Sequence, residues 1–227
     1  MNGERLLKER LSRDWEQQAT ATKLKVSQPY LSLIETGKRP VTKKLARRAM
    51  RVFNLPPTAL PLKDSVEKSR TKAGHLLASQ LAGLNYPKFS HLKKTKNTNP
   101  ADVLMSALAE DDLDSRTVEA LPWLVFNYSE MDWTRVVNSA KLNNAQNRLG
   151  FVLSLALDLA KRSKDENKTD LFKELLSNLY SSRLALNDSF RRKSLTNAEK
   201  EWLRKNRPQN ARRWRVLSNL SSRHLVF

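Results

Sequence analysis

The stretch WEQQATATKLKVSQPYLSLIETGK, residues 15–38, decides the fold of the first part of this chain. Residues 17–24 carry small and apolar side chains at spacings that suit a short helix, and residues 25–26 are left for a tight turn. Ser27 is a favourable N-cap for a second helix, and Pro29 is tolerated in a first helical turn, where the backbone needs no N–H donor. The pattern predicts two short helices joined by a turn.

The second of these helices has an apolar face and a polar face. Leu31 and Ile34 share one face at the i, i+3 spacing, which is typical of residues that pack inward. Four side chains at its start remain to face outward, namely Gln28, Pro29, Tyr30 and Ser32. Because a glutamine can form two hydrogen bonds with adenine in the major groove, the pattern predicts a helix that reads double-stranded DNA.

Residues 26–39, VSQPYLSLIETGKR, resemble the recognition helix and following turn of the phage-repressor (Cro/cI, or xenobiotic-response-element) helix-turn-helix family. The resemblance covers residues 1–62 and implies a five-helix DNA-binding domain, with helices at residues 3–13, 16–24, 27–36, 42–53 and 57–60. Two positions depart from the family pattern. Lys25 stands where a small residue, usually glycine, is common, and Thr20 stands where leucine is common.

The resemblance also implies which residues contact DNA. It assigns base contacts to the start of the second helix and phosphate contacts to Gln17 and the loop after Gly37. Two positions stay open, because Tyr30 and Leu33 could equally be packed in the core. The alternative for the cations after Gly37 is a solvated pair at a helix C-terminus, which is favourable without any ligand, but we favour the phosphate contact. The expected DNA-contacting residues are Gln17, Ser27, Gln28, Pro29, Tyr30, Ser32, Lys38 and Arg39.

The formal net charge of +19 at pH 7 is unevenly distributed along the chain. It is +8 in residues 1–62, +6 in residues 63–100, −4 in residues 101–188 and +9 in residues 189–227. Since each neutralised phosphate releases counterions and strengthens binding, we expect the basic ends to face nucleic acid. Exposed charge runs are often only solvated, so the phosphate contacts outside the motif are candidates: Lys43, Lys93, Lys94, Arg212 and Arg213.

The chain has no cysteine, which excludes disulfides, thiolate catalysis and cysteine-ligated zinc fingers. No apolar signal segment is found at the N-terminus. The longest apolar stretch, residues 149–160, is interrupted by Gly150, Ser154 and Asp158 and is too short to span a membrane. We expect a cytoplasmic protein without a membrane partner. The resemblance implies a prokaryotic or phage-encoded protein associated with the nucleoid.

Composition and periodicity predict an all-α protein, because no alternating strand pattern is found. The predicted segments are a helix-turn-helix domain, a basic connector with one helix, and a helical C-terminal domain with a basic end, at residues 1–62, 63–100 and 101–227. In the last segment, apolar spacing predicts a long buried helix at residues 144–162. Pro122 is expected to open a separate helix at residues 123–128.

The rest of the C-terminal segment also has a helical pattern. Two short helices are expected within residues 170–189, and Thr196 with Glu199 matches a capping box at the start of another helix. The final segment combines many arginines with Trp202 and Trp214. Such a mixture can bind nucleic acid by phosphate contact and stacking, but large aromatic side chains at helical spacing are more often buried. We favour burial for both tryptophans and a phosphate role for some of the arginines.

Enzyme chemistry has little support in the sequence. The three histidines lie far apart and the five glycines leave no phosphate-binding loop, so neither a metal site nor a cofactor is predicted. Residues 110–114 are acidic enough to hold a cation, and Glu166 with Lys168 has a spacing that restriction-type nucleases place on a strand. The dipeptide Ala73-Gly74 resembles the cleavage site of self-cleaving phage repressors, whose cleaving domain is β-rich. A helical chain disfavours the last two alternatives, and we expect no enzymatic activity.

The resulting hypothesis is a sequence-specific transcriptional regulator, a repressor that binds a palindromic operator as a homodimer. The apolar residues 149–159 and 123–133 are expected to lie partly at the subunit interface. One alternative is the antitoxin of a toxin–antitoxin pair, which represses its own operon and neutralises a partner toxin through its C-terminal domain. An alternative of another class is a structural or interaction protein that binds DNA nonspecifically through its basic ends.

Overall fold

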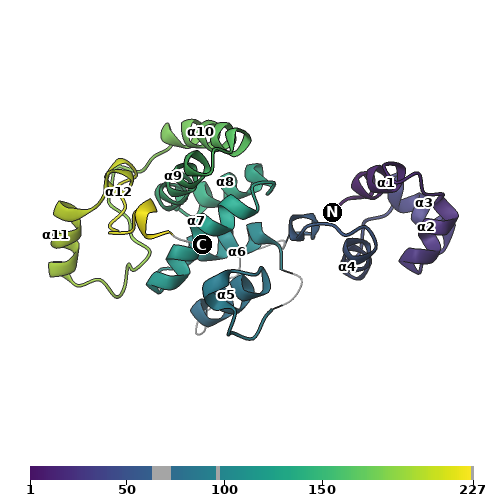
Figure 1. Cartoon of the computed structure of the whole chain (residues 1–227), viewed down its shortest axis with the longest axis horizontal. Helices are drawn as coiled ribbons and strands as arrows, with labels where there is room; N and C mark the ends of the chain where they lie inside the picture. The colour runs from purple at the N-terminus through teal and green to yellow at the C-terminus, as the bar shows by residue number, and fades with distance from the viewer. Residues whose placement is uncertain (63–72, 96–97, 226–227) are drawn as a thin grey trace. The chain divides into compact units, whose positions relative to one another are not determined.

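The computed structural model describes residues 1–62, 73–95 and 98–225, and every regular element in these ranges is helical (Figure 1). The all-α fold class is therefore confirmed. Within the described residues there are two compact units, one of residues 1–62 with 98–99 and the other of residues 73–95 with 100–225. Residues 63–72 and 96–97 of the expected connector, and residues 226–227 of the expected C-terminal segment, lie outside the described residues.

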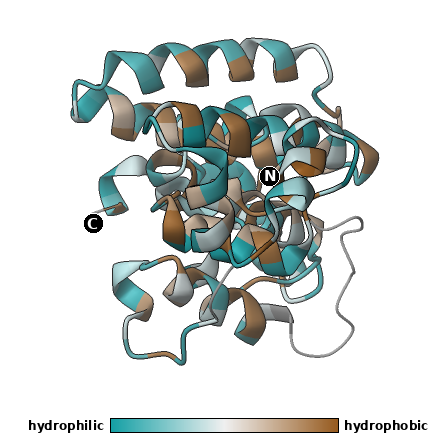
Figure 2. Ribbon diagram, turned by 90° about the vertical axis from the view of Figure 1, so that its right-hand side faces the viewer, coloured by the Kyte–Doolittle hydropathy of each residue, from teal (hydrophilic) through white to brown (hydrophobic). Residues whose placement is uncertain are grey.

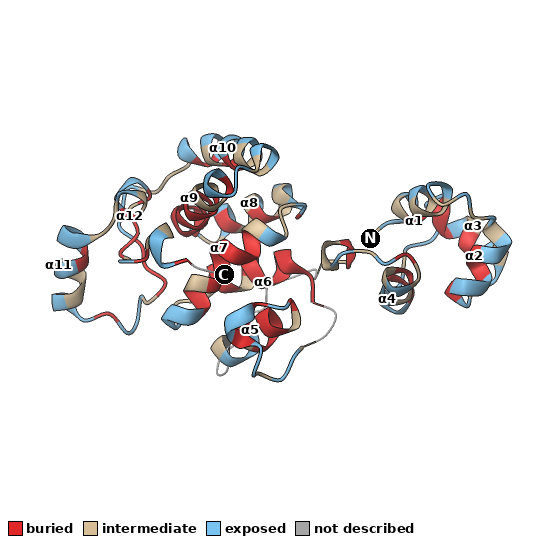
Figure 3. Ribbon diagram, viewed as in Figure 1, coloured by how far each residue is buried: buried red, intermediate tan, exposed pale blue. Residues whose placement is uncertain are grey.

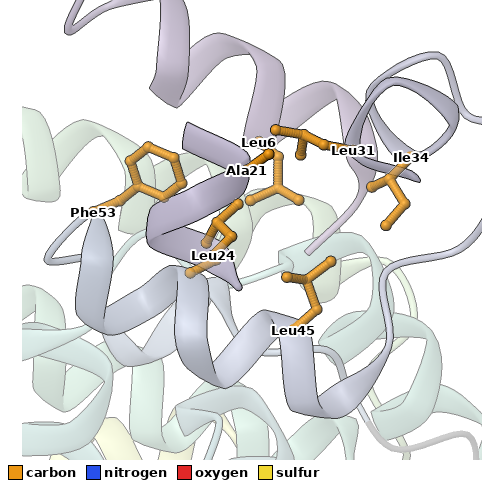
Figure 4. Close-up of a cluster of buried hydrophobic side chains, with 8 residues drawn as sticks. Leu6, Ala21, Leu24, Leu31, Ile34, Leu45 and Phe53 are labelled. Carbon is orange, nitrogen blue, oxygen red and sulfur yellow. The ribbon is translucent and has the colours of Figure 1, made fainter. Parts of the chain in front are cut away.

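The first unit contains four α-helices and one 3-10 turn in residues 1–62. They are α1 (Gly3–Leu11), α2 (Gln17–Leu24), α3 (Gln28–Glu35), α4 (Lys43–Val52) and η1 (Pro57–Ala59). The fifth helix implied by the resemblance is thus a single 3-10 turn. Side chains from the four helices and the residue after α4 meet in one buried cluster: Leu6, Ala21, Leu24, Leu31, Ile34, Leu45, Ala49 and Phe53. Figure 4 shows this cluster and labels all of these residues except Ala49.

The turn between α2 and α3 depends on a left-handed residue. Lys25 ends α2 with a φ of 52°, and the Val26 N–H donates to the Ala21 carbonyl at 3.0 Å. A residue with a Cβ pays about 1–2 kcal/mol for this conformation, which glycine would not. Ser27 then caps α3 by accepting a hydrogen bond from the Tyr30 N–H. The predicted cap is confirmed, and the lysine at the turn is accommodated at a cost.

Two residues of the first unit have unusual packing environments. A Cβ at Gly3 would collide with the backbone carbonyl of Ile34, so α1 crosses directly over the end of α3. Thr20 is 1% exposed and its hydroxyl donates to the Glu16 carbonyl at 2.9 Å. The polar group that stands where leucine is common is therefore buried with its hydrogen bond satisfied.

The second unit is built around one long helix. Its α-helices are α5 (Ala73–Gly83), α6 (Pro100–Ala109), α7 (Ser115–Asn127), α8 (Trp133–Leu142), α9 (Gln146–Arg162), α10 (Glu166–Tyr180), α11 (Asn197–Asn206) and α12 (Gln209–Arg213), and its 3-10 turns are η2 (Pro87–Phe89) and η3 (Ser222–His224). Helix α9 packs against α7, α8, α10 and α12. Figure 3 shows buried residues concentrated on α6, α7 and α9, and Figure 2 shows helices on which apolar and polar segments alternate.

Helix α9 is covered by its own unit. Leu149, Leu153 and Leu155 are each 0% exposed, and Trp123 on α7 is 8% exposed. Helices of the same unit already cover most of this apolar surface, and Leu157, Leu159 and Trp133 remain half-buried. A subunit interface on this surface stays a prediction that is limited to such partly exposed residues. Apolar periodicity predicts that a face is buried and does not say which chain buries it.

Two helix boundaries differ from those predicted. Helix α7 continues through Pro122, where a new helix was expected, and α10 is one helix in place of two short ones. A proline inside a helix removes one backbone hydrogen bond. Leu121 and Leu124, on either side of it, are 0% exposed, and burial of this kind offsets the lost hydrogen bond.

The two tryptophans of the final segment differ in burial. Trp214 is 1% exposed as expected, but the expected burial of Trp202 is wrong, since this side chain is 55% exposed. Helix α11 is held through Leu203, which clusters with Leu195 and Leu217. Successive helical residues point about 100° apart. Trp202 therefore faces away from the cluster that its neighbour Leu203 anchors.

The polar and small residues that interrupt the apolar stretch of α9 form the seat of α12. A Cβ at Gly150 would collide with the indole ring of Trp214, so the ring lies directly on the α9 backbone. Two turns further along α9, Asp158 accepts a hydrogen bond from the Asn210 side chain at 2.8 Å. The predicted capping box of Thr196 and Glu199 at the start of α11 is also present.

We predict that Gly150→Ala destabilises the second unit, because the added methyl group overlaps a ring that the core holds in place. The expected cost is about 1–3 kcal/mol in the free energy of unfolding. The measurement is urea denaturation of the full chain, with hydrogen exchange of α9 as the local probe. Gly74→Ala is the matched control. A Cβ at Gly74 has its nearest neighbour, an Asp114 carboxylate oxygen, at 3.9 Å, so this change should be neutral or stabilising. Equal stability of the two variants would contradict the contact between Gly150 and Trp214.

Candidate DNA-binding surface

Helix α3 is oriented by its two buried residues. Leu31 and Ile34 are 0% exposed, so the opposite side of the helix faces outward. On that side Pro29 is exposed and Gln28 and Ser32 are half-buried. The three residues for which the resemblance implies base contacts thus lie on the accessible side of one helix.

The two open positions on α3 have different environments. Leu33 is 36% exposed and does not belong to the core cluster. Tyr30 is partly buried and packs against that cluster, while the Arg39 guanidinium lies 5.9 Å from its ring centroid. The structure therefore leaves Leu33 accessible to a ligand and gives Tyr30 a packing role.

A chain of hydrogen bonds connects the inside of the first unit to Gln28. Arg10 donates to both carboxylate oxygens of Glu35, at 2.8 and 3.0 Å. Gln17 donates to the same carboxylate at 2.8 Å, and Gln28 donates to the Gln17 side-chain oxygen at 2.5 Å. We call Arg10, Glu35, Gln17 and Gln28 the polar relay. It ties α1, α2 and α3 together and restricts the orientation of the Gln28 amide.

The hydrogen bonds between Arg10 and Glu35, the buried part of the polar relay, are strengthened by charge and burial. The Glu35 side chain is 3% exposed and that of Arg10 is 13% exposed. Hydrogen bonds to Glu35 are the main cause of a raised pKa of the Arg10 guanidinium, against the opposing effect of its burial. Arg10 also donates to the Trp15 carbonyl at 3.0 Å, which ties down the loop before α2.

Sequence reasoning missed Arg10 and Glu35, although one signal was available. Glu35 follows Leu31 at the i, i+4 spacing, so it shares the inward face of α3. A carboxylate on that face needs a buried cation and hydrogen bonds. Its partner is 25 residues away on α1, and nothing in the local pattern identifies it.

The cations after α3 are accessible. Gly37 follows the helix with a φ of 75°, and Lys38 and Arg39 after it are exposed. Lys43, at the start of α4, is exposed too. Within the described residues none of these three cations is within ion-pair distance of a carboxylate. They lie on the same unit as the polar relay.

The other candidate phosphate contacts belong to the second unit. Lys93 and Lys94 are exposed, and Lys94 donates to the Asn85 side chain at 3.2 Å. Arg212 and Arg213 are exposed on α12.

The acidic residues 110–114 and the pair Glu166 and Lys168 were weighed above for cation binding and nuclease chemistry, and several of these side chains make structural contacts. Asp111 pairs with Arg192 at 3.3 Å, and Asp114 caps α7. Glu166 and Lys168 lie in the first turn of α10, not on a strand, and the Lys168 ammonium contacts Asp165 at 2.9 Å. Among the described residues, no cluster of histidine, aspartate or glutamate side chains has the arrangement of a metal site. Ala73-Gly74 begins α5, and residues 98–225 contain no strand that could belong to a self-cleaving domain.

We predict that Glu35→Gln destabilises the first unit by about 2–3 kcal/mol, because it leaves the Arg10 guanidinium buried without a counter-charge. Hydrogen exchange of α1 and α3 in the full chain measures the loss. Glu9→Gln is the matched control. Glu9 pairs with Arg13, also on the N-terminal part of the chain, but with side-chain exposures of 22% and 33%. Such an exposed pair contributes at most about 1 kcal/mol. Similar losses of stability in the two variants would show that the buried pair of Arg10 and Glu35 stabilises the first unit no more than an exposed ion pair does.

The comparisons with known proteins agree with this geometry. The model of the helix-turn-helix family matches residues 6–60, from the middle of α1 to the residue after η1. No curated protein and no solved structure shows significant similarity to the chain. Within the described part of the chain, no helix combines the length and apolar character needed to cross a membrane. The family is one of DNA-binding regulators and not of enzymes. The N-terminal region is therefore a Cro/cI-type helix-turn-helix domain, and this match supports a DNA-binding transcription regulator.

Proposed function

We propose that this protein is a transcriptional repressor that recognises a palindromic DNA site through α3 and binds it as a homodimer. The observation that carries the proposal is the polar relay, which holds Gln28 at the accessible start of α3. A base-reading side chain that is already oriented loses less conformational entropy on binding than a free one.

The geometry of Gln28 is compatible with adenine recognition. One N–H of its amide is engaged by Gln17, which leaves the second N–H and the side-chain oxygen available. Adenine N7 would accept the free N–H, and the adenine N6 amino group would donate to the oxygen. Pro29 offers an apolar contact for a thymine methyl group, and Ser32 offers a hydroxyl one turn further along the helix.

Phosphate contacts would position α3 in the groove. Gln17 donates one N–H to Glu35 and has a second one available. Ser27 accepts from the Tyr30 N–H and its hydroxyl proton remains available for a phosphate oxygen. With Lys38, Arg39 and Lys43 these groups supply donors on either side of the recognition helix.

A protein bound to an operator in this way would repress transcription by covering the site, and we expect it to bind as a dimer. One recognition helix contacts only a few base pairs, so readers of this type usually pair across a two-fold axis. Helix α9 is largely covered by its own unit and offers little apolar surface to a second copy. Leu142 and Leu186 of the second unit are 85% and 81% exposed and are available to a partner protein.

The same exposed leucines favour a second candidate function, in which the second unit neutralises a toxin. An antitoxin also represses its own operon through a helix-turn-helix domain, so the first unit would act identically in both cases. A toxin gene next to the gene of this protein would favour the antitoxin, and a dimer contact through Leu142 or Leu186 would favour the simple repressor.

We predict that Gln28→Ala weakens binding to a site selected from random DNA by about 1–3 kcal/mol and changes binding to unselected DNA little. The two affinities are measured by fluorescence anisotropy at one salt concentration. Gln18→Ala removes the same side chain at an exposed position outside the polar relay. It should leave the ratio of the two affinities unchanged. A loss of equal size on both DNAs in Gln28→Ala would rule out base recognition by this residue.

We also predict that the full chain is a dimer at micromolar concentration and protects two half-sites about 10 base pairs apart. Light scattering gives the mass in solution, and footprinting gives the spacing of the half-sites. A monomer that binds one asymmetric site with full affinity would disprove the dimeric reading.

A further inference from the structure

The cations of the C-terminal region fall into two groups. Those in the first group have carboxylate partners: Arg192 lies 2.8 Å from Asp188, and Arg191 and Lys193 lie 3.9 and 3.8 Å from Glu199 and Asp111. The second group has none within the described residues. It includes Lys200, Arg223 and five cations that follow one another closely along the chain, namely Lys205, Arg207, Arg212, Arg213 and Arg215. These five are called the arginine cluster below.

Backbone and amide acceptors hold the arginine cluster in place. Arg212 donates to the carbonyls of Arg207 and Lys205 at 3.0 and 2.8 Å. Arg207 donates to the Asn187 side chain at 2.8 Å, and Arg215 donates to a carbonyl of the loop after α10. These acceptors are neutral, so they orient the guanidinium groups without compensating their charge.

The support beneath the arginine cluster is rigid. Ala211 and Trp214 are 0% and 1% exposed and fix α12 on the Gly150 side of α9. Arg212 and Arg213 lie between these two anchors and are exposed. The donors are thus presented from a well-packed element and need little reorganisation to bind a ligand.

Like charges are crowded in the free protein. The pKa of the Arg207 guanidinium is lowered, first by burial and then by repulsion from Arg212, Arg204 and Arg215. The only one of these with a carboxylate partner in the described residues is Arg204, which pairs with Glu201. An anion at the cluster would relieve this repulsion, and a planar guanidinium matches the geometry of phosphate oxygens.

We propose that the arginine cluster binds the phosphate backbone of double-stranded DNA, as a second DNA contact located in the second unit. The shape of the cluster favours a duplex over a single strand. Single-strand binding uses exposed rings on which bases stack. Here the Tyr180 ring has the guanidinium groups of Arg183 and Arg213 at 4.6 and 5.4 Å from its centroid, and Trp214 is buried. Tyr180 is 46% exposed but already has these two cations at its ring, and Trp202 on α11 is 55% exposed. One open ring in this region is not the series of rings on which a single strand stacks successive bases, so the cluster suits a duplex backbone better.

This contact carries no sequence information, so it differs in kind from recognition by α3. It would add affinity that falls with salt concentration and would retain the protein on DNA on either side of its site. The inference does not require that α3 reads sequence.

The test compares two triple variants of the full chain on random duplex DNA. In the first variant Lys205, Arg212 and Arg213 are replaced by glutamine. The control has Lys173→Gln, Arg191→Gln and Lys193→Gln, which lowers the net charge equally but removes cations that already have carboxylate partners. The slope of log affinity against log salt should become shallower by about 0.9 for each lost phosphate contact, and so by up to about 2.7 in the first variant. The control should keep the wild-type slope.

Three outcomes would overturn the inference. These are an unchanged slope in the first variant, equal changes in both variants, and loss of binding to poly-glutamate with unchanged binding to duplex DNA. The last outcome would assign the cluster to an acidic protein. Hydrogen exchange of α9 checks that the variants are folded. If the triple variant is not, Arg213→Gln replaces it with an expected change of about 0.9, since within the described residues the Arg213 guanidinium lies over Tyr180 and donates no hydrogen bond. Failure of sequence recognition by α3 would appear in the Gln28→Ala experiment and not here.

Discussion

The Glu35 carboxylate is the group on which the candidate DNA-binding surface depends. It is 3% exposed, and it accepts hydrogen bonds from α1 through Arg10 and from α2 through Gln17. A buried carboxylate without such donors would cost several kcal/mol, so its three hydrogen bonds require the three helices to keep one arrangement. The orientation of Gln28 follows from that arrangement. Because one side of the network is buried and the other reaches the surface, the same interaction serves stability and positions a side chain for a ligand.

In the second unit the equivalent constraint is steric. The Trp214 ring lies on the backbone of α9 at Gly150, where a larger residue would not fit. The three interruptions of the apolar stretch, Gly150, Ser154 and Asp158, follow each other at four-residue intervals and therefore lie on one side of α9. They appear in the sequence as breaks in a hydrophobic helix, but in the structure they are the surface that receives α12. Through this contact the packing of the core also sets the position of the arginine cluster.

The basic residues of the C-terminal region serve two different purposes, since some pair with carboxylates of the same chain and others have no such partner among the described residues. Part of the basic C-terminal region neutralises the acidic middle, as Arg192 does with Asp188 and Asp111. The arginine cluster has no such compensation within the described residues. A net charge of +9 over residues 189–227 does not distinguish these cases, since it counts both groups alike. Only the positions of the carboxylates in space separate a structural cation from one that is available to a phosphate.

The sequence by itself determined the features that depend on neighbouring residues. Ser27 and Thr196 cap helices because a capping oxygen and its N–H partner lie three residues apart, and Leu31 and Ile34 face inward because a helix repeats every 3.6 residues. For the same reason the all-α class and the outward direction of Gln28 were predictable. The tertiary structure alone decided features that depend on distant residues. The pairing of Arg10 with Glu35, the continuation of α7 through Pro122, the exposure of Trp202 and the covering of α9 by its own unit each depend on what packs against the residue. Local periodicity states that a face is buried, but the identity of the partner is set by contacts between segments far apart in the chain.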